Sequence, residues 1–134
     1  MDFQTIDFTN LKPTNIDTYD SILSDLLISD EKVEACFHTV RDGVAFTNYR
    51  ILLIDVKGVT GKKRSIITLP YRKIRAYSIE TAGVMDFDSR LEVLINGIGE
   101  IEFSFTSNWL KLSGKASLGI FSKFPPTINL FILA

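Results

Sequence analysis

The chain has 134 residues, of which 46% are hydrophobic and 23% charged, and its formal net charge is −1. These values are typical of a single globular domain and exclude a disordered or fibrous chain. An isoelectric point near 5.8 argues against a nucleic-acid partner, and no apolar run approaches the roughly 20 residues that cross a bilayer. The start lacks the features of a secretory signal and the single cysteine, Cys36, has no disulfide partner, so we expect a cytoplasmic protein.

Residues 1–14 show no sustained hydrophobic period, and we expect a disordered or loosely docked lead there. From residue 15 onward, Ile16, Tyr19, Leu23 and Leu26 fall on one face of a helix of about three turns. The start of that helix resembles a capping box, because an acid stands three residues after Thr14.

Short alternating or apolar runs predict seven β-strands. They cover residues 33–39, 44–46, 51–56, 66–69, 72–81, 91–95 and 100–106. The third run is apolar throughout, which predicts cover on both of its faces. Pro70 ends the fourth strand and Asn96-Gly97 is a strong hairpin signal. We expect a mainly β fold, an antiparallel sandwich or small barrel, over residues 15–106.

Turns between these strands carry the polar residues of most interest. Thr47 and Asn48 favour a turn because their side chains bond to nearby backbone. Arg50 is expected to fix that turn by reaching a carboxylate such as Glu80 or the carbonyl groups of the turn. Two glycines, Gly58 and Gly61, bound the next hairpin, and Gly83 closes the fifth strand. We interpret these six residues as structural.

Residues 107–134 form an atypical segment. Gly114, Ser117 and Gly119 weaken a helix there, and Pro125-Pro126 would stop one. Whether this segment caps the barrel with a helix stays open.

Candidate catalytic and metal-binding groups are sparse. Cys36 and His38 lie two apart on one strand and therefore share a face, but the sequence has no second His or Cys to complete a site. Asp86, Asp88 and Glu92 lack the glycine-centred loop spacing of a calcium site. We therefore expect no enzyme activity, no metal and no cofactor.

Three consecutive bases, Lys62, Lys63 and Arg64, follow the Gly58–Gly61 hairpin. They form either a solvated turn or a contact for a phosphate or anionic lipid headgroup. The segment is too short for a nucleotide P-loop and is not followed by a helix pattern.

Six short motifs, in order along residues 15–106, resemble the bacterial pleckstrin-homology (PH) domain family, of the small stand-alone cytoplasmic type. They are Lys32-Val33-Glu34-Ala35-x-Phe37, Arg41-Asp42, Phe46-Thr47-Asn48-x-Arg50, Gly58-x-Thr60-Gly61-Lys62-Lys63, Leu69-Pro70-Tyr71 and Ser78-x-Glu80-Thr81-Ala82-Gly83. The resemblance implies a seven-stranded, bent antiparallel barrel closed by a C-terminal helix, and assembly into homo-oligomeric rings. Residues 107–134 depart from the family, because they contain three lysines, no acid and two adjacent prolines.

Charge is distributed in blocks that suit such assembly. Residues 1–34 contain eight acids and two lysines, residues 35–75 nine bases and two acids, and residues 76–106 six acids and one arginine. Blocks of opposite sign can meet within one fold or across a subunit boundary. We expect a non-enzymatic, self-associating protein-binding module; the alternative is a peripheral binder of anionic headgroups through residues 62–64.

Overall fold

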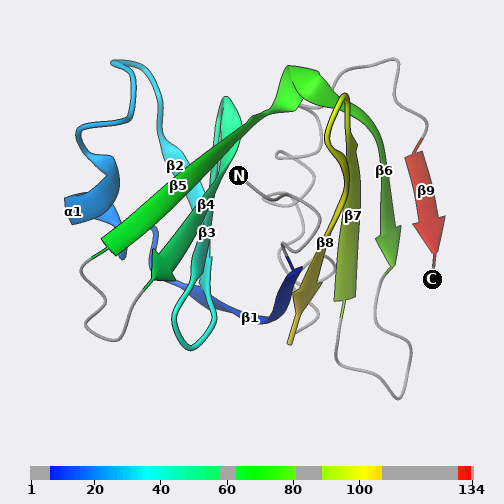
Figure 1. The fold of residues 1–134 in the computed structure, drawn as a ribbon, viewed down its shortest axis with the longest axis horizontal. Coiled ribbons are helices and arrows are strands. Elements are labelled where there is room, and N and C mark those ends of the chain that lie inside the picture. The colour runs from blue at the N-terminus through cyan, green and yellow to red at the C-terminus, as the bar shows by residue number, and fades with distance from the viewer. Residues whose placement is uncertain (1–6, 58–62, 81–88, 107–129, 134) are drawn as a thin grey trace.

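The computed structural model describes residues 7–57, 63–80, 89–106 and 130–133 (Figure 1). These described residues include nine strands, which form one sheet. In chain order the elements are β1 (Asp7–Thr14), α1 (Asp20–Leu23), β2 (Val33–His38), β3 (Gly43–Thr47), β4 (Arg50–Lys57), β5 (Lys63–Pro70), the 3₁₀ helix η2 (Tyr71–Lys73), β6 (Ile74–Glu80), β7 (Ser89–Ile95), β8 (Gly99–Phe105) and β9 (Leu130–Leu133). The seven strands predicted between residues 33 and 106 are β2 to β8, so the mainly β class is confirmed.

The sheet is bent into two halves. Its strand order is β5-β4-β3-β2-β1-β8-β7-β6-β9, and Figure 1 shows β2 to β5 on one side and β6 to β9 on the other, with β1 passing between them. Successive strands from β2 to β5 and from β6 to β8 pair antiparallel. Two pairings are parallel, β1 with β8 and β9 with β6.

Aromatic rings from β2, β3 and β8 pack together between the two halves. The ring of Phe37 on β2 lies 4.8 Å from that of Phe105 on β8, and Phe46 on β3 lies 6.2 Å from Phe103 on β8. All four rings are fully buried. Tilted and edge-on aromatic pairs of this kind add to the stabilisation that burial provides.

The strand β4 is covered on both faces, as its continuous apolar run predicts. Ile51 and Leu53 face the main core, whereas Leu52 and Ile54 join a second cluster on the outside of the sheet. All four side chains have no exposed surface. Leu23 of α1 completes the outer cluster.

The expectation of a loose lead over residues 1–14 is wrong for residues 7–14, which form β1. This strand pairs first with β8 and then with β2, and its register shifts between Phe8 and Leu11. Asn10, at the shift, has φ of +58°, a left-handed conformation that Asn tolerates better than most residues. Because the irregularity places the two core residues three apart instead of two, the alternation of a strand is missing from the sequence.

The predicted three-turn helix is also wrong. In the segment from residue 15 to residue 28, only Asp20–Leu23 form an α-helix, within a run of turns. The backbone N–H groups of Asp20, Ile22 and Leu26 donate to the carbonyl three residues earlier, as in a 3₁₀ turn. The segment therefore does not keep the 3.6 residues per turn of an α-helix. Leu23 is buried, but Ile16 and Leu26 are 56% and 45% exposed. Thr14 belongs to β1 and caps no helix.

All three glycines in the described ranges, Gly43, Gly97 and Gly99, occupy positions that a side chain would disturb. Gly97 has φ of +81° in the predicted hairpin between β7 and β8. Gly43 begins β3, where a Cβ atom would overlap the hydroxyl of Tyr19.

The C-terminal segment is described only at β9, so the question of a capping helix falls mainly on residues 107–129, outside the described residues. No helix in the described ranges is both long and apolar enough to span a membrane.

Candidate functional site

The turn between β3 and β4 is built around the hydroxyl of Thr47, which has no exposed surface. Its Oγ1 accepts hydrogen bonds from the backbone N–H groups of Tyr49 and Arg50, both at 3.0 Å. The same hydroxyl donates to Glu31 Oε2 at 2.6 Å. Thr47 therefore both shapes the turn and attaches it to the segment that precedes β2.

Asn48 makes a second attachment to that segment. The N–H of Lys32 donates to Asn48 Oδ1 at 2.8 Å, and Asn48 Nδ2 donates to the carbonyl of Asp30 at 3.0 Å. The hydroxyl of Tyr49 donates to the Asp30 carboxylate. The amide of Asn48 is thus held at both its oxygen and its nitrogen, and the ring of Tyr49 is held at its hydroxyl.

Arg50 forms the charged centre of the site. Its Nε and Nη2 donate to Glu31 Oε2 and Oε1, both at 2.9 Å, and Nη2 also donates to the carbonyl of Leu26 at 2.9 Å. The Glu31 side chain is 1% exposed and that of Arg50 21%. The carboxylate that contacts Arg50 is therefore Glu31, whereas Glu80 lies at the end of β6.

Glu31 is ionised in this environment. Burial by itself would raise the pKa of its carboxyl group, but the hydrogen bonds from Arg50, Thr47 and the Ile28 N–H, together with the Arg50 charge, lower it below the ordinary value. A buried carboxylate with these donors is a stable anchor for the guanidinium group.

Tyr71 closes the network from η2. Its hydroxyl donates to the Thr47 carbonyl at 2.6 Å, and its backbone N–H donates to the Tyr49 carbonyl at 3.2 Å. Neither Tyr71 nor Glu31 was predicted to belong to this site. The sequence does indicate that Arg50 needs a carboxylate partner, but nothing in the strand pattern distinguishes Glu31 from the other acids.

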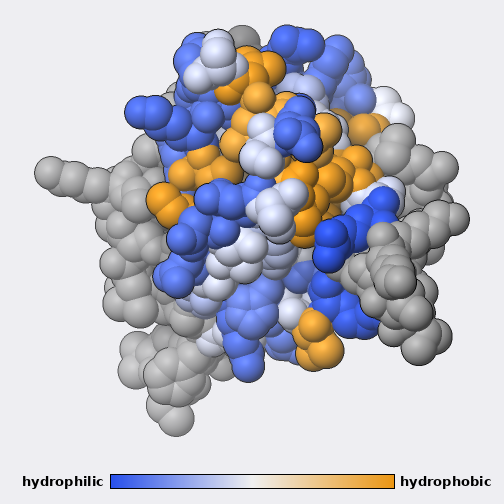
Figure 2. Space-filling view, turned by 90° about the vertical axis from the view of Figure 1, so that its left-hand side faces the viewer, coloured by the Kyte–Doolittle hydropathy of each residue, from blue (hydrophilic) through white to orange (hydrophobic). Residues whose placement is uncertain are grey.

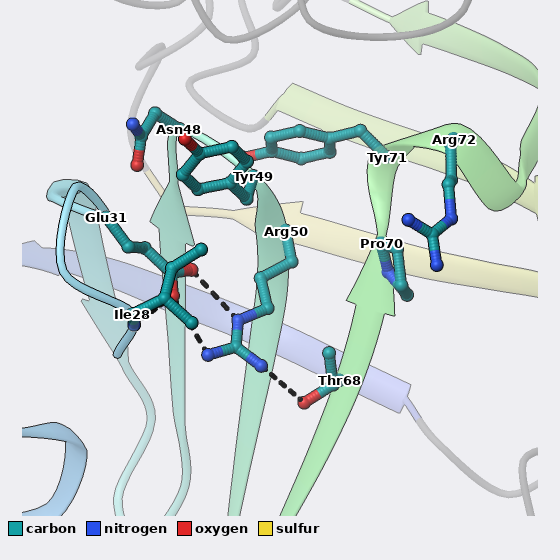
Figure 3. Close-up of a pocket in the computed structure, with 9 residues that line it drawn as sticks. All are labelled: Ile28, Glu31, Asn48, Tyr49, Arg50, Thr68, Pro70, Tyr71 and Arg72. Atoms are coloured by element: carbon teal, nitrogen blue, oxygen red, sulfur yellow. Dashed lines mark hydrogen bonds and ion pairs between the residues drawn. The ribbon is translucent and has the colours of Figure 1, made fainter. Parts of the chain in front are cut away.

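A pocket of about 420 Å³ opens beside this network (Figure 3). Its walls include Ile28, Tyr49 and Pro70, with Arg50 and Thr68 between them. In Figure 3, Arg72 stands beside Pro70, on the opposite side of Arg50 from Ile28. The structure thus brings Arg72, from η2, to the same pocket as the turn residues and Arg50.

The other predicted site residues fall elsewhere. Lys62 and the glycines Gly58, Gly61 and Gly83 lie outside the described residues. Lys63 begins β5, and Arg64 follows it with an exposed side chain. The structure therefore describes one side chain of the predicted basic cluster.

Cys36 and His38 lie in surroundings that suit packing. Cys36 is 2% exposed, and burial, with smaller contributions from the Asp20 and Asp17 charges, raises the pKa of its thiol to about 11. His38 Nδ1 lies 3.1 Å from the Thr39 carbonyl. Within the described ranges, no three His, Cys, Asp or Glu side chains gather as a metal site would require.

Two faces of the sheet carry opposite charge. On β7 and β8, Glu92 stands directly opposite Glu102, and Leu94 opposite Glu100. Arg90 lies 3.6 Å from Glu102 and offsets one of these acids. β5 lies at one end of the strand order, in the half of the sheet away from β7 and β8. β5 and the η2 helix that follows it carry three exposed bases: Arg64, Arg72 and Lys73. Figure 2, on the side of α1 and β5, shows apolar surface bordered by hydrophilic residues.

Comparison with known proteins places this architecture. The family model for the bacterial PH domain matches residues 2–111. The chain is 47% identical over 75 residues to the uncharacterized protein YjqA of Bacillus subtilis, an alignment that covers 56% of this chain and 60% of YjqA.

Two solved structures are similar over most of their length. A protein with a pleckstrin-homology domain from Shewanella loihica has a TM-score of 0.65 and 30% identity, over 85% of this chain and 97% of that one. A pleckstrin homology domain from Shewanella amazonensis has a TM-score of 0.57 and 29% identity, over 80% and 89%. With its bent sheet and its match to the family model over residues 2–111, the chain belongs to the bacterial PH domain family.

Proposed function

We propose that the protein is a non-enzymatic interaction module that binds further copies of itself head to tail. The observation that carries this proposal is the pair of oppositely charged faces, one on β7 and β8 and the other along β5 and η2. A contact between two different faces repeats from copy to copy, and it closes into a ring when the rotation permits.

The acidic face supports this reading most directly. Like charges placed opposite each other on neighbouring strands destabilise a sheet, yet Glu92 and Glu102 form such a pair. Arg90, 3.6 Å from Glu102, offsets that acid, and a basic partner surface would neutralise Glu92. Leu94, 38% exposed beside them, offers apolar contact to the same partner.

The basic face has matching features. β5 is the last strand of the sheet order, so one of its edges has no strand partner among the described residues. Unpaired edges are common sites of association. Leu26 is 45% exposed, and its carbonyl contacts Arg50 on β4, the neighbour of β5. Each face therefore combines charge with an exposed apolar side chain.

Charge reversal tests the proposal. Glu92→Lys with Glu102→Lys converts the acidic face, and Arg64→Glu with Lys73→Glu converts the basic face. Each double variant should sediment as a lighter species than the wild type. Mixing the two variants should restore mass, because each contributes a face that complements the other.

The alternative outcomes are distinct. If the wild type is a monomer, or if the reversed variants assemble as it does, the proposal is wrong. Asp17→Lys, at an exposed position between β1 and α1, is a matched control that should leave the mass unchanged.

A second proposal is contact with anionic headgroups through residues 62–64. It is supported by Arg64, which is exposed and makes no ion pair with any described residue. Vesicles with anionic lipid should retain the protein at low salt, where electrostatic attraction is strongest. Failure to float with them, or equal flotation of Arg64→Gln, would rule out that role.

The proposal also includes a cytoplasmic location and no catalytic role. Cys36 supports the location because its thiol is free of any disulfide. It supports the absence of catalysis because a buried thiol with a raised pKa is a poor nucleophile.

A further inference from the structure

The pocket beside the Thr47 turn has apolar walls and a net positive lining. Glu31 and Arg50 neutralise each other across two bonds of 2.9 Å. Arg72 then adds one positive charge with no charged partner among the described residues. A cation that borders a pocket and lacks a partner favours an anionic occupant.

Most polar groups of the pocket wall already have partners. The amide of Asn48 bonds to the backbone of residues 30 and 32, and the hydroxyls of Tyr49 and Tyr71 bond to Asp30 and Thr47. These bonds fix the wall before any ligand arrives. Binding to a fixed wall avoids the entropic cost of ordering it.

Some hydrogen-bond donors on the exposed side of the pocket are still available to a ligand. Arg50 has five N–H donors; three bond to Glu31 and Leu26, and one Nη1–H makes a long contact of 3.5 Å to Thr68 Oγ1. One further Nη1–H therefore stays available, and Thr68 is exposed. Together with Arg72, these groups provide donors for anionic oxygen atoms along one side of the pocket.

The rest of the pocket lining is apolar and partly exposed to water. Tyr49 is 42% exposed and Ile28 is 55% exposed, although both line the pocket together with Pro70. A flat ring packed between them would remove this apolar surface from water. The volume of about 420 Å³ lies within the range of small-molecule sites.

We propose that this pocket binds a small organic anion, a flat ring that carries a carboxylate or phosphate group, with the anion on Arg72 and the ring against Tyr49. This pocket borders the basic face of the self-association proposed above, because Arg72 belongs to both. The charge-reversal variants of that test, Arg64→Glu and Lys73→Glu, leave Arg72 in place, so the two proposals are tested separately. The pocket also differs from the basic cluster at residues 62–64.

Titration calorimetry with benzoate and with phenyl phosphate tests the site, and the two probes distinguish carboxylate from phosphate. We expect saturable binding in the millimolar range for at least one of them, as befits so few atoms. Arg72→Gln should weaken binding about tenfold or more, because a charge-assisted hydrogen bond is lost. Arg75→Gln, an exposed arginine on β6, is the matched control and should bind as the wild type does.

Neutral benzamide and ring-free acetate complete the design, and each should bind at least about tenfold more weakly than benzoate or phenyl phosphate. The proposal is overturned if neither anionic probe binds at a concentration of about 20 mM, which is well above the dissociation constant expected for such small ligands. It is also overturned if Arg72→Gln binds as tightly as the wild type, or if benzamide matches the anions. Arg72 is exposed, so circular dichroism of the variant should show an unchanged fold.

Discussion

Replacement of Glu31 by Gln removes the charge that holds the Thr47 turn to the segment before β2. The carboxylate accepts four hydrogen bonds, from Arg50 Nε and Nη2, from the Thr47 hydroxyl and from the Ile28 N–H. An amide group has one acceptor oxygen, so its NH₂ would face donors that it cannot satisfy.

The expected cost follows from burial. Breaking a buried ion pair by removal of one partner costs about 3 to 5 kcal/mol. Arg50 is 21% exposed and regains some hydration, so we expect about 3 kcal/mol. For a domain of this size that corresponds to a fall in Tm of roughly 10 °C. Chemical denaturation and calorimetry at neutral pH measure both quantities.

The pH dependence provides an independent check. The folded-state pKa of Glu31 is lowered, so its contribution to stability is complete above the unfolded pKa of 4.5 and is lost as pH falls through the folded pKa. The difference between wild type and Glu31→Gln should be constant near neutrality and shrink in acid. Glu80→Gln, at an exposed position, should cost less than about 0.5 kcal/mol. A cost for Glu31→Gln equal to this control, or a difference that persists at low pH, would refute the reasoning.

Three further predictions concern the fold. Gly43→Ala should destabilise by about 1 kcal/mol, because the new Cβ displaces Tyr19 from its 3.3 Å bond to the Phe37 carbonyl; the loss should vanish in a Tyr19→Ala background, and full additivity would contradict the contact. Asn10→Val should cost about 1 to 2 kcal/mol at φ of +58°, whereas Asn10→Gly should be nearly neutral in urea unfolding. Cys36 should resist a thiol reagent at pH 8 in the native protein and react once it is unfolded; rapid native labelling would show that the thiol is accessible.

Local pattern predicted the meander between residues 33 and 106 because its strands obey simple rules. Ile101, Phe103 and Phe105 alternate with polar residues, and the structure buries all three on β8. Within β2 to β5 and within β6 to β8, neighbours in the sheet are also neighbours in sequence, as hairpin signals indicate. These signals do not show that β5 and β6, which follow one another in sequence, lie in different halves of the sheet.

Long-range pairing escaped the same rules. β1 joins β8, about 95 residues away, through the contact of Thr106 with the Leu11 carbonyl. β9 pairs with β6 in parallel, and its apolar run carried no sign of which strand it would join. Such choices depend on the shape of the closed core rather than on local propensity.

Only part of the candidate site could be predicted from the sequence, because the rest also depends on long-range contacts. Thr47 and Asn48 act on backbone within the turn or just across it, which their residue types indicate. Glu31 and Tyr71 reach the turn from segments 16 and 24 residues away. The pocket forms only once β5 and η2 are folded back beside the turn, which places Arg72 at its edge.

Sedimentation equilibrium of the wild-type chain is the most direct test of the proposed self-association. At low micromolar concentration and physiological salt, we predict a mass several times 15.1 kDa. That mass should fall in about 1 M salt, where charges are screened beyond roughly 3 Å. A mass of 15.1 kDa at every salt concentration would contradict the account.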